Sequence, residues 1–213
     1  MEHILDDGGV RGVMHLPDKP VGDGVALTHG AGSNCNTPLL IALARDFEAA
    51  GLAVLRYDLP FRVLRPIGSP FPAGAIRDRE GVRAAVEALR KYAPRRVFAG
   101  GHSYGGRQTA MAAAEHPDLA DGLLLLAYPL HPPRRPDQLR TAFFPQLRTP
   151  TLFVHGTRDP FASIEELRAA TQQIPAFTQI FVVERSGHDL KPVAHLAAEL
   201  LTRMFSLKCY PEN

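Results

Sequence analysis

Short apolar runs alternate with segments of helical periodicity along most of this chain. From residue 24 onward, apolar runs predict buried strands at 24–30, 52–60, 95–101, 121–129, 149–156 and 178–184. Continuous runs of this length are typical of parallel strands that are covered on both faces. The segments between them predict helices near 37–50, 78–92, 104–115, 163–174 and 191–206.

Two of the predicted helices carry specific signals, an apolar face in one and a helix start in the other. In 78–92, apolar residues recur at helical spacing opposite a charged face. Ser163 stands three residues before Glu166, which is the spacing of a capping box and predicts a helix start. Strands that alternate with helices predict a doubly wound α/β fold, with a mostly parallel sheet and helices on both faces. We find no repeat or linker, so residues 1–213 are expected to form a single domain.

Two proline-rich segments, 60–75 and 129–150, fit neither pattern. Each follows a predicted strand, so both are expected at the carboxyl edge of the sheet, where open α/β sheets bind ligands. The second segment is only about twenty residues long and is interrupted by prolines, which is too short to pack a core of its own. No separate cap domain is therefore expected.

Composition narrows the function classes. The 213 residues are 45% hydrophobic and 22% charged, with a formal net charge of +2, which argues against nucleic acid or an anionic membrane as a partner. The longest apolar stretch, 123–130, is too short to span a bilayer. The first residues lack a signal-peptide pattern, and Cys35 and Cys209 lack metal-ligand spacing. We expect a cytoplasmic protein that needs no metal and no cofactor.

A cluster of glycines surrounds one serine after the predicted strand 95–101. Gly101-His102-Ser103-Tyr104-Gly105 matches G-x-S-x-G between that strand and a predicted helix. At a nucleophile elbow, the serine takes a strained backbone conformation that exposes its hydroxyl, and small neighbours let strand and helix approach. The alternative is a tight turn with no chemistry. The strand–turn–helix context favours Ser103 as a nucleophile.

A serine nucleophile needs a base, and the base needs an orienting acid. Asp159 follows the predicted strand 149–156, and His188 follows the predicted strand 178–184. The order serine, acid, histidine is that of α/β-hydrolases. Asp58 is the alternative acid, while Asp159 and His188 could each be ordinary loop residues. Because both follow strand ends in the required order, Ser103, Asp159 and His188 are predicted as a catalytic triad.

The oxyanion that forms in such a reaction needs hydrogen-bond donors fixed in advance. The N–H of Tyr104, directly after the nucleophile, is one expected donor. The other is expected from the loop 29–34, at Ala31, with Gly32 as the alternative. Read alone, this loop could bind phosphate, but it lacks both G-x-G-x-x-G and the lysine of a P-loop.

The sequence resembles the α/β-hydrolase superfamily over nearly its whole length. Within that superfamily it more closely resembles small bacterial dienelactone-hydrolase-like proteins, whose domain also occurs in a eukaryotic chromatin-complex subunit. The segments that carry the resemblance are HGAGSN, RYDLPF, GGHSYGGR, YPLHPP, LFVHGTRDPF and SGHDL. The resemblance implies a hydrolase without fixing a substrate. Dienelactone hydrolases themselves use cysteine where this chain has Ser103, so their specific activity is not carried over.

The leading hypothesis is a serine hydrolase that cleaves a small carboxylic ester or related acyl compound. A thioesterase, an acyltransferase or a peptidase would use the same triad, and a non-catalytic interaction module is the remaining alternative. The acyl group, the leaving group and the oligomeric state stay open. Six arginines lie near the predicted site in the sequence, and two interpretations are open: they favour an anionic substrate, or most of them have solvated surface roles, which is the preferred interpretation. They are Arg62, Arg65, Arg107, Arg134, Arg135 and Arg158.

Overall fold

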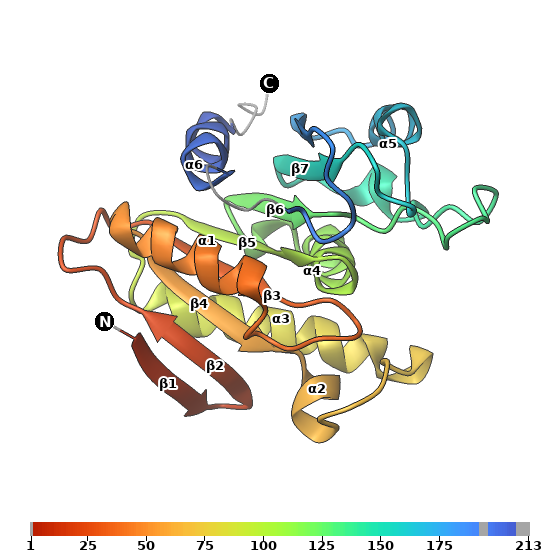
Figure 1. The fold of residues 1–213 in the computed structure, drawn as a ribbon. Coiled ribbons are helices and arrows are strands. Elements are labelled where there is room, and N and C mark those ends of the chain that lie inside the picture. The colour runs from red at the N-terminus through yellow and green to blue at the C-terminus, as the bar shows by residue number, and fades with distance from the viewer. Residues whose placement is uncertain (1, 192–195, 208–213) are drawn as a thin grey trace.

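An eight-stranded sheet runs through the centre of the molecule in the computed structural model, which describes residues 2–191 and 196–207 (Figure 1). The strands lie in the order β1-β2-β4-β3-β5-β6-β7-β8, and β3 to β8 are mutually parallel while β1 and β2 pair antiparallel. Their bounds are β1 Glu2–Asp7, β2 Val10–His15, β3 Gly24–Thr28, β4 Ala53–Asp58, β5 Val97–His102, β6 Gly122–Leu126, β7 Thr151–Gly156 and β8 Thr178–Val183.

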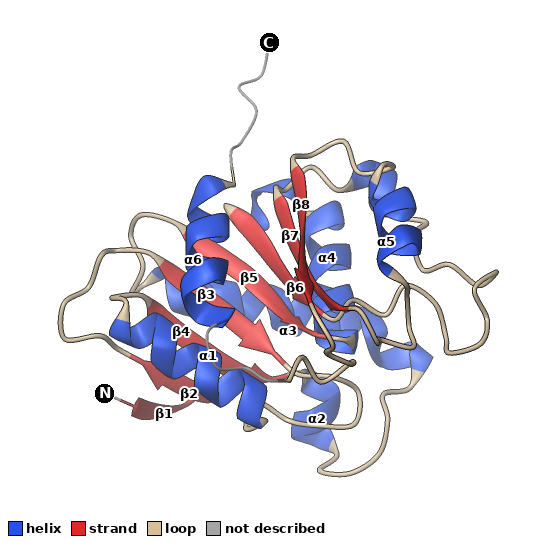
Figure 2. Cartoon of the chain, turned by 45° about the horizontal axis from the view of Figure 1, so that its top comes forward, coloured by secondary structure: helices blue, strands red, loops and turns tan. Residues whose placement is uncertain are grey.

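Helices cover both faces of this sheet (Figure 2). The α-helices are α1 Pro38–Ala49, α2 Pro60–Leu64, α3 Ala75–Arg90, α4 Tyr104–Glu115, α5 Ile164–Thr171 and α6 Leu196–Ser206. Helices α1 and α6 pack on one face, and α3, α4 and α5 pack on the other, so each face has its own apolar core. The predicted doubly wound α/β fold is confirmed.

The strands predicted from apolar runs are all present, with bounds that differ by a few residues. The capping box also forms, because the Ser163 hydroxyl accepts from the Glu166 N–H at 3.1 Å and the Glu166 carboxylate accepts from the Ser163 N–H at 2.7 Å. The prediction missed the hairpin of β1 and β2, which lies at the sheet edge, where β1 has few buried positions and no apolar run marks it. It also missed α2, inside the proline-rich segment 60–75. Residues 192–195 of the last predicted helix lie outside the described residues.

The connection from β6 to β7 packs against the core of the protein. Its described residues contain one 3-10 turn, η3 (Phe144–Gln146), and no α-helix. The ring of Phe144 is fully buried against Tyr128 and Phe153, with ring centroids 5.6 and 6.2 Å apart. This segment is therefore an ordered wall, as the expectation of no separate cap requires. No helix among the described residues is long and apolar enough to cross a membrane.

Candidate active site

Ser103 occupies a sharp turn between β5 and α4. Its backbone has φ 53° and ψ −117°, a strained conformation for a residue with a side chain. Helix α4 can approach the sheet closely because Gly105 and Gly106 have no side chain. A Cβ at Gly105 would lie 2.5 Å from the His29 carbonyl oxygen, and a Cβ at Gly106 would lie 2.5 Å from the Gly101 carbonyl oxygen. The glycines around Ser103 therefore have a packing role, and the geometry is that of a nucleophile elbow.

The side chains of Ser103, His188 and Asp159 form a continuous hydrogen-bonded chain. The Oγ of Ser103 lies 2.8 Å from Nε2 of His188, and Nδ1 of His188 lies 2.8 Å from Oδ2 of Asp159. The three residues come from the loops after β5, β8 and β7, whose carboxyl ends meet at one edge of the sheet. With its proton on Nδ1, the imidazole can accept the serine proton at Nε2.

The carboxylate of Asp159 is fully buried and held on both sides. Besides His188, it accepts from the Phe161 N–H through Oδ1 at 2.9 Å. The Nε2 of the neighbouring His155 ring lies 3.8 Å from Oδ2 of Asp159 and donates to the Ala162 carbonyl oxygen at 3.0 Å. Burial lowers the pKa of His155, which favours the neutral ring. His155 thus links the carboxyl end of β7 to the backbone of the loop that follows it.

His102 positions the proposed base, a role that the sequence did not reveal. Its Nε2 lies 2.7 Å from the backbone oxygen of His188, and because a carbonyl only accepts, Nε2 is the donor. Burial lowers the pKa of His102, which favours the neutral ring with its proton on Nε2. The Phe161 ring packs against the His188 imidazole, with ring centroids 4.3 Å apart. These contacts fix the backbone and the ring plane of His188.

Two backbone N–H groups are available beside Ser103. Ala31, Ser103 and Tyr104 line the same cavity, and Tyr104 is the first residue of α4, where helix N–H groups lack partners within the helix. Within residues 2–191 and 196–207, neither the Ala31 N–H nor the Tyr104 N–H has a hydrogen-bond partner. Gly32, the alternative donor, is exposed to solvent. The two amides expected to bind an oxyanion are thus free to do so.

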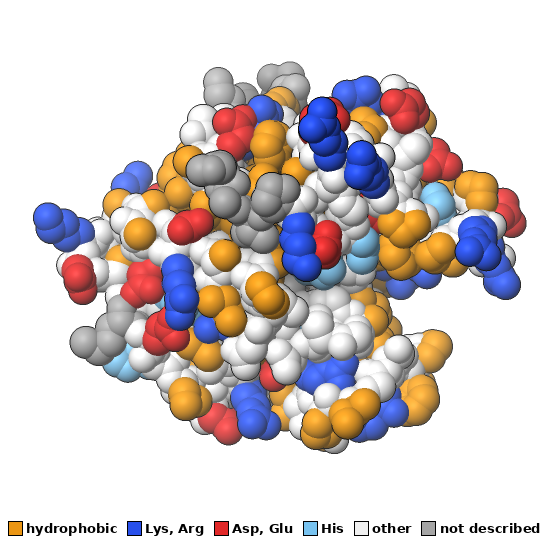
Figure 3. Space-filling view, in the orientation of Figure 1, with side chains coloured by type: hydrophobic (Ala, Val, Ile, Leu, Met, Phe, Trp, Pro, Cys, Tyr) orange, Lys and Arg blue, Asp and Glu red, His pale blue; other side chains and the backbone are white. Residues whose placement is uncertain are grey.

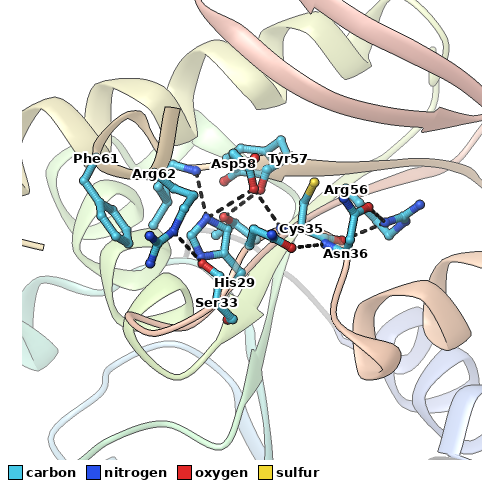
Figure 4. Close-up of polar contacts among 12 residues, drawn as sticks. His29, Ser33, Cys35, Asn36, Arg56, Tyr57, Asp58, Phe61 and Arg62 are labelled. Carbon is cyan, nitrogen blue, oxygen red and sulfur yellow. Dashed lines mark hydrogen bonds and ion pairs between the residues drawn. The ribbon is translucent and has the colours of Figure 1, made fainter. Parts of the chain in front are cut away.

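A buried arginine holds the loop that carries Ala31 (Figure 4). Arg62, on α2, donates to the backbone oxygens of Ser33 at 2.8 Å and Ala31 at 2.9 Å. It also donates to the backbone oxygens of Arg65 at 3.1 Å and Gly68 at 3.0 Å. Arg62 is only 6% exposed, so the expectation of a solvated surface arginine is wrong at this position.

The alternative acid, Asp58, belongs to the same support. Its Oδ1 accepts from the Cys35 N–H at 2.7 Å and lies 3.5 Å from Nε2 of His29 (Figure 4). Burial lowers the pKa of His29, and Nε2 of that ring also accepts from the Leu59 N–H at 3.1 Å. Asp58 therefore stabilises the loop 29–35, and Asp159 is the acid that meets His188. Cys35 is buried and free, whereas Cys209 lies outside the described residues.

A cavity of about 530 Å³ opens beside Ser103. Its walls come from the two proline-rich segments, with Phe71 on one side and Pro129 and Arg140 on the other. Figure 3 shows the surface hollowed between the loop after β6 and the start of α3. The predicted location of both segments at the carboxyl edge of the sheet is thus confirmed, and together they delimit one cleft.

The remaining arginines divide into two groups. Arg134, Arg135 and Arg158 are exposed, in line with surface roles. Arg65 stacks on Phe71, its guanidinium carbon 4.0 Å from the ring centroid, and Arg107 lines the cavity beside Ser103. Arg140, which was not predicted as a site residue, lines that cavity as well. Among the described residues, no group of three or more His, Cys, Asp and Glu side chains is placed to hold a metal ion.

Comparison with known proteins gives the same fold. Residues 23–205 match the family described as alpha/beta hydrolase domain. A dienelactone hydrolase from Anabaena variabilis is 24% identical with a TM-score of 0.74, and the match covers 96% of each chain. An α/β serine hydrolase without a lid from Xanthomonas campestris is 18% identical with a TM-score of 0.74, covering 99% of this chain and 96% of that one. Est1E from Butyrivibrio proteoclasticus, solved with ferulic acid bound, is 16% identical with a TM-score of 0.73, covering 95% and 99%.

Proposed function

This chain belongs to the alpha/beta hydrolase family, and we propose that it is a serine hydrolase that cleaves a small carboxylic ester or related acyl compound. The observation that carries the proposal is the hydrogen-bonded chain from Ser103 through His188 to Asp159, which begins at a strained elbow. An isolated serine on a tight turn would need neither a histidine at 2.8 Å nor a buried carboxylate behind it.

In the proposed mechanism, the Ser103 oxygen attacks the carbonyl carbon of the substrate as its proton passes to Nε2 of His188. Asp159 orients the imidazole and stabilises the imidazolium that forms. The N–H groups of Ala31 and Tyr104 donate to the developing oxyanion. His188 then returns the proton to the leaving oxygen, which departs as an alcohol and leaves an acyl group on Ser103. Water, deprotonated by His188, hydrolyses this acyl-enzyme and restores the serine.

The hydrogen-bonded chain of Ser103, His188 and Asp159 does not by itself select the type of bond that is cleaved. Thioesters and amides react through the same acyl-enzyme, and an acyltransferase differs only in the acceptor that replaces water. The walls of the cleft are fixed by packing, and no cap closes over it within the described residues, which supports a small substrate. We therefore place esters of short acids first and thioesters second.

Hydrolysis of p-nitrophenyl acetate by wild type and Ser103→Ala tests the proposal. Removal of a triad nucleophile costs about a million-fold in kcat, so the variant should fall to the background rate. Ser206→Ala is a matched control, because this exposed serine on α6 contacts only the Arg203 carbonyl oxygen, at 2.8 Å, and the Gln179 amide, at 3.5 Å, among the described residues. A folded Ser103→Ala protein that hydrolyses the ester at the wild-type rate would show that the chemistry lies elsewhere.

A further inference from the structure

Two arginines enter the cavity that contains Ser103. Arg107 lies on the first turn of α4, four residues after Ser103, so the two residues share a helix face about one turn apart. Arg140, on the connection between β6 and β7, lines the same cavity. Both positive charges therefore border the cavity that an acyl group bound to Ser103 would enter.

The guanidinium of Arg107 has one N–H donor, at Nε, that the rest of the described chain does not use. Its Nε is buried, and no hydrogen-bond partner for it exists among residues 2–191 and 196–207. The contrast with Arg62 is informative, because Nε and both terminal nitrogens of Arg62 donate to backbone oxygens. Leaving a buried N–H of a cation unpaired is costly and is rare in folded proteins. A ligand that accepts from Nε would remove this cost.

Arg107 and Arg140 are neighbours without a counter-charge. The Tyr128 hydroxyl donates to the backbone oxygen of Arg140 at 2.7 Å, and the positive charges of Arg107 and Arg140 both act on the pKa of Tyr128, which burial raises. Burial and the nearby positive charge of Arg107 lower the pKa of Arg140. In the described part of the chain, no carboxylate oxygen lies within the 4.0 Å of an ion pair from either guanidinium.

The carboxylate of Asp78, which meets Tyr104 beside this cavity, is already engaged. Asp78 accepts from the Tyr104 hydroxyl at 2.7 Å and from the Phe61 N–H at 3.0 Å. Gln108, 1% exposed and next to Arg107, also lines the cavity, and its Oε1 has no partner among the described residues. Arg140 donates to the Pro129 backbone oxygen at 3.2 Å, so the cavity presents two cations that lack a carboxylate partner among the described residues, one of which, Arg107, also has an unpaired Nε.

We propose that Arg107 and Arg140 form an anion subsite, and that the acyl substrate carries a carboxylate a few carbons from the carbonyl that Ser103 attacks. The substrate class is then the monoesters of short dicarboxylic acids. The planar edge of a guanidinium fits a carboxylate with two parallel hydrogen bonds, and the free Nε of Arg107 supplies one of them. This inference rests on the proposed function, because it concerns the acyl side of the same cleft.

A pair of substrates that differ in one charge tests the subsite. We compare kcat/KM for p-nitrophenyl hydrogen adipate, which has a free carboxylate, with that for p-nitrophenyl methyl adipate, which is neutral. Wild type should favour the acid by about tenfold to a hundredfold, the size expected for a hydrogen bond to a charged group. Arg107→Gln and Arg140→Gln should each reduce this ratio towards one, and Arg107→Lys should keep part of it. Arg135→Gln, at an exposed arginine of the same connection, should leave the ratio unchanged.

Binding gives a readout that does not depend on turnover. Titration calorimetry at fixed ionic strength should show that Ser103→Ala binds monomethyl adipate at least about tenfold more tightly than dimethyl adipate, and that adding Arg107→Gln removes the difference. Equal binding of the two compounds, or a kcat/KM ratio near one in wild type, would overturn the subsite. Ser103-dependent cleavage of the neutral ester together with a ratio of one would leave the proposed function standing. Charge-selective binding without cleavage of either ester would support the subsite and count against the function.

Discussion

Replacing Arg62 by glutamine should damage the catalytic step as well as the fold, because this residue holds the loop that carries Ala31. Arg62→Gln keeps a polar side chain but removes the four hydrogen bonds to the backbone oxygens of Ala31, Ser33, Arg65 and Gly68. The Ala31 N–H then loses its fixed direction towards the carbonyl that Ser103 attacks.

The magnitudes follow from these contacts. Hydrogen bonds from a charged donor contribute about 1.5 kcal/mol or more each, so four give a gross loss of about 6 kcal/mol. Water can replace Arg62 at the exposed carbonyl of Gly68 and at half-exposed Arg65, so we expect a net loss of about 2–4 kcal/mol in the free energy of unfolding. For a chain of this size, that lowers Tm by about 4–16 °C. Loss of one oxyanion donor lowers kcat by about a hundredfold to a thousandfold.

The assay is kcat for p-nitrophenyl acetate at a temperature where circular dichroism shows the variant to be folded, with Tm measured in parallel. Arg62→Lys should fall between wild type and Arg62→Gln, since an ammonium cannot reach four carbonyls with a planar fork. Arg135→Gln, at an exposed arginine, is the control for loss of charge alone. A folded Arg62→Gln protein with kcat within threefold of wild type would refute the link between Arg62 and the oxyanion donor.

Three further predictions concern pH, chain length and metals. Burial lowers the pKa of His15, His29, His102 and His155, so the unfolded chain binds more protons, and the free energy of unfolding should fall as pH drops below about 6.5. Burial raises the pKa of Asp78, which opposes this loss of stability at low pH, but one carboxyl is outnumbered by four histidines. Urea titrations at pH 7.5, 6.5 and 5.5 measure the free energy of unfolding, and a constant or rising value as the pH drops would contradict the prediction. Across p-nitrophenyl esters from acetate to palmitate, kcat/KM should not rise with length, because the cleft wall at Phe71 is 64% exposed and a methylene gains about 0.8 kcal/mol only when buried. Dialysis against EDTA should leave activity unchanged, and a loss that zinc or calcium restores would contradict the mechanism.

The order of elements from β3 onward, and the location of Ser103, Asp159 and His188 directly after strand ends, could be predicted because the signals for them are local. Strands buried on both faces are continuous apolar runs, and Asp159 and His188 each follow such a run directly. The glycines beside Ser103 mark a strand and a helix in close contact, which a Cβ would prevent. Topology then brings the three loops to one edge of the sheet.

The supporting residues could not be predicted because their partners are distant and lack periodicity. Arg62 meets Ala31 and Ser33 across about thirty residues of sequence, through a short helix that begins at a proline. Arg140 enters the cavity from an irregular connection whose path depends on the burial of Phe144. His102 gives no signal in the sequence, because its partner is a backbone oxygen that any residue at position 188 would supply.

Covalent labelling of Ser103 tests the proposed chemistry most directly. The native protein is treated with a fluorophosphonate, and the modified residue is located by mass spectrometry of the intact chain and of its peptides. A nucleophile activated by His188 predicts one adduct per chain, on Ser103, that is lost in Ser103→Ala and strongly slowed in His188→Ala and Asp159→Ala, and retained in Ser206→Ala. A folded protein that takes up no label, or labels equally well without His188, would contradict a Ser103–His188–Asp159 catalytic triad.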